Sequence, residues 1–112
     1  MIIRRVLMLV LLCISVPAVA QMVTIERAYE IAVDDLRLPG NVVGSVSFKD
    51  CNTCAKQTVR VTTETRYVLN NRDVSLVEFR KAVNTIVNKK TNIATVIHHL
   101  ESDSIVAVHV VK

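Results

Sequence analysis

Apolar and polar residues alternate along most of the chain after residue 24, which is the period of half-buried β-strands. Clusters of turn-forming residues separate the alternating segments, among them Pro39-Gly40-Asn41 and the polar runs 70–73 and 101–104. Strands are therefore predicted over residues 25–33, 42–48, 57–63, 66–69, 93–100 and 105–111, with the last two joined as a hairpin.

The first of these segments fits two kinds of element. Ile31 and Val33 continue an alternation with acidic residues that is typical of a strand. The same segment also places a set of apolar residues on one side of a helix: Ile25, Ala28, Tyr29, Ala32 and Leu36. The pattern alone leaves residues 24–36 open between strand and helix.

One segment predicts a helix with a defined start. Ser75 and Glu78 form a capping box, in which the Ser75 hydroxyl accepts a hydrogen bond from the Glu78 N–H. The apolar residues that follow share one helix face: Leu76, Phe79, Ala82, Val83, Ile86 and Val87. Lys89 and Lys90 are expected at the end of the helix, where the helix dipole is negative.

The predicted element order is βββ(β)-α-ββ, which indicates an α+β fold that is mainly β with one α-helix. A single helix covers only one face of a sheet, and the closely spaced strands leave little room for parallel crossovers. We therefore expect a curled antiparallel sheet or a small, partly open β-barrel, with the helix at one end. No repeat or long linker interrupts residues 21–112, so a single small β-rich domain is predicted.

The first twenty residues have the three parts of a secretory signal peptide. Two arginines precede the apolar run 6–16, and small residues lead to Ala20, just before Gln21. Cleavage between Ala20 and Gln21 predicts a periplasmic or secreted protein with no stable membrane anchor. An uncleaved anchor is the alternative, but Pro17 and the small residues after it stand where a spanning helix needs bulk.

Charge and composition argue against one class of partner. The chain carries 14 basic and 10 acidic residues, and two of the basic ones fall in the predicted signal peptide, which leaves a mature net charge of about +2. No basic run of the mature chain is longer than two residues, as at Lys89-Lys90. Nucleic-acid binding requires a clustered basic face, commonly with aromatic residues, so no nucleic-acid partner is expected.

Three cysteines become two after cleavage, because Cys13 lies in the apolar run of the predicted signal peptide. Lipid attachment to Cys13 is not expected, because bulky leucines precede it where small residues are needed. Cys51 and Cys54 remain, in the motif C-N-T-C between two predicted strands. In an oxidising compartment this pair predicts a disulfide that staples a tight turn. A thiol–disulfide redox site is an alternative, although the motif lacks the helix N-terminus that activates such cysteines.

A metal site is the second alternative for these cysteines. If the last hairpin has a two-residue turn, His98 and His109 become diagonal neighbours on one face of the sheet. With Cys51 and Cys54 they would complete a Cys₂His₂ set suited to zinc or copper, and His99 is a further candidate. The simpler interpretation is that His98 and His99 are partly exposed strand residues on opposite faces, with no cofactor bound.

No group of residues predicts catalysis, because the serines lack the G-x-S-x-G context of a hydrolase nucleophile and Glu78 is accounted for by capping. We expect a non-enzymatic periplasmic protein, a small interaction or structural module that binds an envelope protein or itself. The final strand is long, β-branched and at the chain end, so it is expected to form the sheet edge that accepts another strand. A metal-binding protein and a thiol–disulfide redox protein remain the alternatives.

Five short motifs stand out along the mature chain: Gly44-Ser45-Val46-Ser47-Phe48, Cys51-Asn52-Thr53-Cys54, Thr65-Arg66-Tyr67, Val74-Ser75-Leu76-Val77-Glu78-Phe79-Arg80 and His98-His99-Leu100-Glu101. Together they resemble a group of short, exported Gram-negative proteins that are uncharacterised. The resemblance implies a periplasmic address, and it assigns no activity and no catalytic residue.

Overall fold

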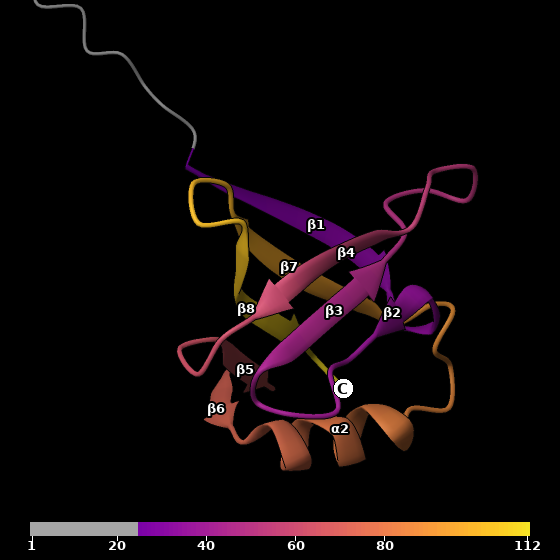
Figure 1. Cartoon of the computed structure of the whole chain (residues 1–112). Helices are drawn as coiled ribbons and strands as arrows, with labels where there is room; N and C mark the ends of the chain where they lie inside the picture. The colour runs from indigo at the N-terminus through magenta and orange to yellow at the C-terminus, as the bar shows by residue number, and fades with distance from the viewer. Residues whose placement is uncertain (1–24) are drawn as a thin grey trace, which may run out of the picture.

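The fold is that of a computed structural model of the chain, which describes residues 25–112 (Figure 1). The elements are, in chain order, β1 (Glu26–Ala32), the 3₁₀ turn η2 (Val33–Asp35), β2 (Leu36–Arg37), β3 (Gly44–Phe48), β4 (Gln57–Val61), β5 (Arg66–Leu69), β6 (Arg72–Val74), α2 (Leu76–Asn84), β7 (Ile93–His99) and β8 (Ser104–Val110). The described part is mainly β with a single α-helix, so the predicted α+β class is confirmed. No helix in residues 25–112 is long and apolar enough to cross a membrane. The predicted signal peptide and the Ala20/Gln21 cleavage site lie outside the described residues.

The eight strands form one curled, mixed sheet that does not close into a barrel (Figure 1). Its order is β1-β7-β8-β4-β3-β2, with β5 beside β8 and β6 beside β5. Strand β8 runs antiparallel to β7 but parallel to β4 and β5, whereas the sequence predicted a wholly antiparallel sheet. Parallel neighbours need a long crossover, and the chain between β5 and β8 supplies one that contains β6, α2 and β7.

Residues 26–32 form a strand, which decides between the two patterns predicted for this segment. β1 pairs antiparallel with β7 along its whole length, from Glu26 opposite His99 to Ala32 opposite Ile93. The buried residues on this strand are Tyr29 and Ile31, two positions apart, as the alternation requires. The helical alternative is wrong, because the backbone groups of β1 hydrogen-bond to β7 and the side chains on the inner face of β1 are buried in the core.

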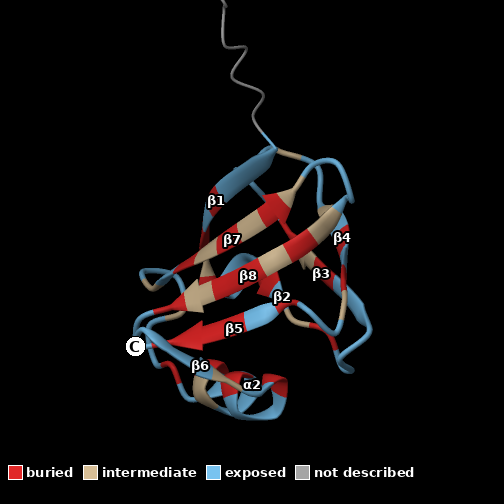
Figure 2. Cartoon of the chain, turned by 90° about the vertical axis from the view of Figure 1, so that its left-hand side faces the viewer, coloured by how far each residue is buried: buried red, intermediate tan, exposed pale blue. Residues whose placement is uncertain are grey.

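The hydrophobic core lies inside the curl of the sheet. Phe48 and Phe79 are fully buried there, and their rings pack against Tyr29 and Tyr67 respectively, with centroids 5.0 and 5.4 Å apart. Buried and less buried residues alternate along β7, as the colouring of Figure 2 shows. Helix α2 lies across one end of the curl in both views and contributes the Phe79 side chain to the core (Figures 1 and 2).

Helix α2 begins as predicted but ends earlier. The Ser75 hydroxyl accepts a hydrogen bond from the Glu78 N–H at 3.2 Å, which confirms the cap. At the other end the Thr85 hydroxyl and N–H both donate to the Ala82 carbonyl, at 2.8 and 3.2 Å, and this tighter turn closes the helix. Val87 is consequently 93% exposed rather than part of the apolar stripe, and the lysines that follow lie in a loop.

A hairpin replaces the polar turn predicted at residues 70–73. Asn70 and Asn71 have positive φ values of 51° and 65°, the backbone geometry of a two-residue type I′ turn. This turn pairs Leu69 with Arg72 and creates β6. The strand was missed because asparagine marks a turn without indicating how few residues the turn takes.

Candidate functional site

The C-N-T-C motif forms the tip of the β3–β4 hairpin. Cys51 and Cys54 are joined by a disulfide, as predicted, with their Cα atoms 5.0 Å apart. The Cys54 N–H donates to the Cys51 carbonyl at 3.2 Å and closes a tight turn. Cys51 and Thr53 are exposed, Cys54 is half-buried, and the Thr53 hydroxyl oxygen lies 3.6 Å from the Cys51 sulfur.

The register of the β7–β8 hairpin separates the two histidines that were predicted to converge. A two-residue turn predicts His98 opposite Ala107, but the loop has four residues and His98 lies opposite Ile105. His109 lies opposite Thr95, and the register shifts by a residue between Ile97 and His98. Because side chains alternate with period two, this difference moves His109 to the face away from His98.

The predicted Cys₂His₂ set is therefore not assembled. Cys51 and Cys54 are bonded to each other and are not thiolates that could ligate a metal. Across residues 25–112, no three His, Cys, Asp or Glu side chains are grouped so as to hold a metal ion.

His98 is a core residue, not the partly exposed strand residue that was predicted. Its side chain lies beside the Tyr29 ring, with centroids 6.3 Å apart, and the residue is 8% exposed. Its Nε2 lies 2.7 Å from Oδ1 of Asp103, a turn residue with a φ of 49°. Its Nδ1 is buried and has no hydrogen-bond partner in the described part of the chain. The hydrogen bond to Asp103 ties the β7–β8 loop to the core.

His99 makes a contact that the sequence did not indicate. The Ser102 N–H and hydroxyl both lie within hydrogen-bond distance of His99 Nδ1, at 3.2 and 3.0 Å. The Ser102 hydroxyl also bonds the Ser104 hydroxyl at 2.7 Å. No carboxylate of the described residues hydrogen-bonds to the His99 ring. Ser102 and His99 therefore have no acidic residue to orient the imidazole, as the Asp of a hydrolase triad does. Both contacts stabilise the turn.

The segment Thr65-Arg66-Tyr67 divides between core and surface as its alternation predicts. Arg66 makes a two-pronged ion pair with Asp73 on the outer face, with N–O distances of 2.9 and 3.1 Å. Tyr67 faces the core, and its buried hydroxyl has no hydrogen-bond partner among residues 25–112. Burial raises the pKa of the Tyr67 phenol above its ordinary value of 10.0.

The sheet edge expected at the last strand lies elsewhere. β8 is paired on one side with β7 and on the other with β4 and β5, so it is interior and the expectation of an edge there is wrong. β1, in contrast, is seven residues long and pairs within residues 25–112 with β7 alone. The other edge strands, β2 and β6, have two and three residues. β1 is therefore the long edge of the sheet.

Two hydrogen bonds define which backbone groups of β1 point outward. Ile25 accepts from the Leu100 N–H at 2.8 Å, and the Val33 N–H donates to Asn92 at 2.9 Å, so odd-numbered residues bond to β7. In an antiparallel pair the alternate residues direct both backbone groups away from the partner. The outward groups thus belong to the even-numbered residues, Glu26, Ala28, Glu30 and Ala32.

The disulfide loop lies beside this edge. The Arg27 guanidinium on β1 is 3.9 Å from the Asp50 carboxylate, next to Cys51 in sequence, and also lies 4.9 Å over the Tyr29 ring. Ala32 at the end of β1 and Asn52 within the motif line one pocket of about 350 Å³. The free edge and the disulfide therefore occupy adjacent surface.

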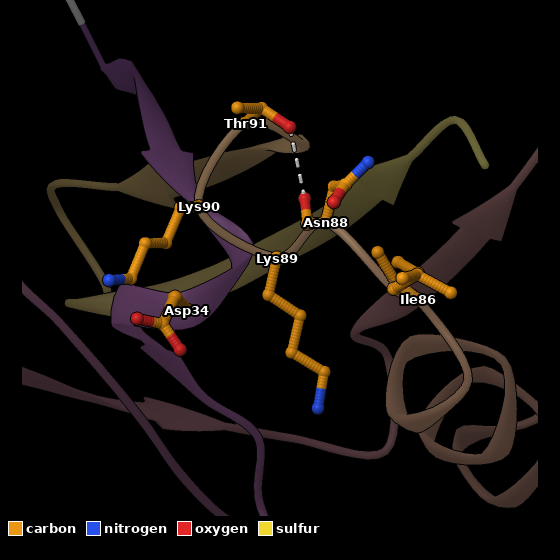
Figure 3. Close-up of a pocket in the computed structure, with 7 residues that line it drawn as sticks. Asp34, Ile86, Asn88, Lys89, Lys90 and Thr91 are labelled. Carbon is orange, nitrogen blue, oxygen red and sulfur yellow. Dashed lines mark hydrogen bonds between the residues drawn. The ribbon is translucent and has the colours of Figure 1, made fainter.

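A second pocket, of about 550 Å³, opens between η2 and the loop after α2 (Figure 3). The Asp34 N–H donates to the Lys89 carbonyl at 3.0 Å, which holds the two segments together. Asp34, Lys89 and Lys90 line it from exposed or half-buried positions, with charges of both signs. Such a mixed, open lining selects no particular ligand, so the pocket is not assigned a role.

Comparison of the chain with protein-family models, with curated proteins and with solved structures found no match in any of the three. The candidate site therefore rests on the geometry of the β1 edge and the C-N-T-C loop.

Proposed function

We propose that this chain is an exported protein-interaction module that binds an extended segment of an envelope protein along the free edge of β1. The observation that carries the proposal is the outward row of backbone groups at Glu26, Ala28, Glu30 and Ala32, which no strand of the described residues pairs with. A strand added to such an edge gains main-chain hydrogen bonds irrespective of its sequence. The signal-peptide pattern of residues 1–20 supports an envelope location.

The side chains beside the edge suggest the chemistry of the partner. Glu26 and Glu30 are exposed on the outer face of β1, separated by the small, exposed Ala28. Residues directly opposite on adjacent strands have Cβ atoms about 5 Å apart, and opposite charges there are favourable. The preferred partner is therefore an extended segment with Lys or Arg at alternate positions. Pairing of β1 with a second copy is the competing mode of association.

The test uses a synthetic peptide of alternating Lys and Thr, titrated into isotopically labelled protein and followed by NMR and amide hydrogen exchange. We expect shift changes confined to β1 and its neighbours, with slower exchange of the amides of residues 26, 28, 30 and 32. A peptide with Glu in place of Lys is the control and should bind more weakly. No change with either peptide contradicts strand addition, and dimerisation in its absence supports self-association instead.

Two substitutions at one position separate edge pairing from side-chain effects. Ala28→Pro removes an outward N–H without breaking the hydrogen bonds to β7, because proline is tolerated on the open side of an edge strand. Ala28→Val keeps the N–H and is the matched control. We expect the proline variant to lose peptide binding while it keeps the fold, and the valine variant to bind as the parent does.

The proposed export has its own measurement. Mass spectrometry of protein isolated from the periplasm should give a chain that begins at Gln21, with Cys51 and Cys54 oxidised. Ala20→Leu should block processing, because signal peptidase accepts only small residues before the cleavage site. Recovery of the full-length parent from the membrane fraction would contradict export as a cleaved protein.

A further inference from the structure

We propose that the Cys51–Cys54 disulfide is a thiol–disulfide exchange site whose substrates are cysteine pairs of other polypeptides. This activity goes beyond the proposed binding function and does not depend on strand addition at β1. It rests on three features of the C-N-T-C loop: the flanking strands are paired by their own backbone hydrogen bonds, Cys51 is more exposed than Cys54, and the Thr53 hydroxyl lies beside the Cys51 sulfur.

The fold around the loop is held together without the disulfide. β3 and β4 are already paired over five residue pairs, from Gly44 opposite Val61 to Phe48 opposite Gln57. No residue of the loop 49–56 is buried, so none belongs to the core. A ring closed by two intervening residues restricts the unfolded chain only modestly. Opening the bond therefore costs little, whereas a disulfide that ties together distant parts of a fold resists reduction.

The two cysteines differ in exposure. Cys51 is exposed at the tip of the hairpin, and Cys54 is half-buried. An incoming thiolate attacks the sulfur it can reach, so Cys51 is the residue that exchanges with the substrate. Cys54 is then the leaving thiolate and, in the reverse direction, the resolving cysteine.

A side-chain contact of Cys51 bears on its reactivity after reduction. A sulfur in a disulfide carries no hydrogen, so the Thr53 hydroxyl is the donor in the 3.6 Å contact with Cys51. After reduction the same hydroxyl can donate to the thiolate. A hydrogen bond donated to the charged form of a group favours that form, so this contact favours the Cys51 thiolate.

The exchange balances in two steps. A substrate thiolate attacks the Cys51 sulfur, the bond to Cys54 breaks, and its electron pair leaves on Cys54, which gives a mixed disulfide. The second substrate thiolate attacks the substrate sulfur of that bond and releases Cys51. The substrate loses two protons and two electrons and becomes a disulfide, and Cys51 and Cys54 become a dithiol. A disulfide-bonded polypeptide restores the original bond by the reverse sequence.

The first experiment measures the rate of mixed-disulfide formation at each cysteine separately, in the complete mature chain. Cys54→Ser keeps Cys51 as a single thiol, and Cys51→Ser keeps Cys54. With a synthetic disulfide-bonded peptide as the probe, we expect the Cys51 thiol to form the mixed disulfide about tenfold faster or more, since access and thiolate fraction both favour it. Equal rates, or faster reaction at Cys54, overturn the assignment of roles.

The second experiment follows the parent with a reduced two-cysteine peptide. We expect oxidised parent to convert the peptide to its disulfide with one equivalent of Cys51–Cys54 reduced, while circular dichroism reports an unchanged fold. Thr53→Val should slow the exchange several-fold, and Thr53→Ser should restore it by retaining the hydroxyl. A bond that stays oxidised against excess reduced peptide, or a chain that unfolds on reduction, shows a purely structural disulfide. Ala28→Pro, which impairs the β1 edge, should leave the exchange unaltered, so the two proposals fail independently.

Discussion

The loops of the β3–β4 and β7–β8 hairpins both lie at the end of the sheet away from α2 (Figure 1), yet they are held closed by different means. The β3–β4 loop carries a covalent bond, Cys51–Cys54, and has no buried residue. The β7–β8 loop carries no covalent bond, but its Asp103 is hydrogen-bonded to His98, which is buried beside Tyr29. The covalent bond is therefore in the loop that has no buried residue, and the hydrogen bond is in the loop that is attached to the core.

This contrast has an energetic consequence. A covalent link within a short loop acts mainly on the unfolded chain, and its effect grows with the length of chain it closes. A buried side chain with a hydrogen bond contributes packing, and its removal leaves both a cavity and an unpaired partner. We therefore expect the β7–β8 hairpin to be more important for stability, and the β3–β4 loop to be freer for chemistry.

The largest loss of stability is expected from a substitution in the core, and the effects of the hairpin variants are compared with it. Phe79→Ala removes a fully buried ring that packs on Tyr67 and should lower the free energy of unfolding by about 3–5 kcal/mol. Thermal and urea unfolding measure it, with the exposed Val77→Ala on the same helix as control. An unchanged melting temperature for Phe79→Ala would contradict the burial of this helix face.

The next largest effect is expected at His98. His98→Ala should cost about 2–4 kcal/mol, because it creates a cavity beside Tyr29 and leaves Asp103 without its partner. Asp103→Asn keeps a residue that tolerates positive φ and should cost about 1 kcal/mol. The comparison between the hairpins fails if chemical denaturation finds His98→Ala less destabilising than loss of the disulfide.

Loss of the disulfide should have a smaller effect. Cys51→Ser/Cys54→Ser should remain folded and lose about 1–2 kcal/mol, since the bond closes only a short ring. Amide hydrogen exchange should show faster exchange confined to residues 49–56, with the pairs between Val46 and Val59 still protected. Loss of protection across β3 and β4 would mean that the bond supports the whole hairpin.

The smallest expected effect is a gain in stability, at Tyr67. It measures the cost of a buried polar atom without a hydrogen-bond partner among the described residues, a feature that Tyr67 shares with His98. Tyr67→Phe removes that atom with little change of shape and should stabilise the protein by about 1 kcal/mol.

The same variant tests the pH dependence of stability. Because burial raises the pKa of Tyr67 in the folded state, the folded chain binds more protons than the unfolded chain as pH rises past 10.0. Ionisation of this group therefore leaves the free energy of unfolding unchanged below that pH and lowers it as the pH rises through the raised pKa of the folded state. The parent should therefore lose stability above pH 10.0 more steeply than Tyr67→Phe, as unfolding at a series of pH values would measure. Parallel curves would contradict the burial of the phenol.

The sequence predicted those elements whose boundaries are determined by residues close together in the chain. Ser75 and Glu78 lie three residues apart, so the cap that starts α2 is visible in four letters of sequence. Strand β5 was predicted with its observed bounds because residues 66–69 are rich in β-forming residues. The helix end at Asn84 was missed, since an apolar stripe continues past a turn that is closed by Thr85.

The candidate site was predictable only in part. Two cysteines separated by two residues, in a chain with a predicted export signal, predict their own pairing because the bond is local. The position of the free edge was mistaken, because the place of a strand in a sheet depends on which distant segments pair with it. β8 ends the chain but is enclosed by β7 on one side and by β4 and β5 on the other.

The sequence by itself determined the α+β composition, the start of α2 and the Cys51–Cys54 pair, all of which follow from residues a few positions apart. The tertiary structure alone decided which strand is the edge, which face His109 takes and how deeply His98 is buried. Those features depend on register and strand order, which are set by packing across the whole sheet. A shift of one residue reverses every side chain of a strand, and no local pattern reports it.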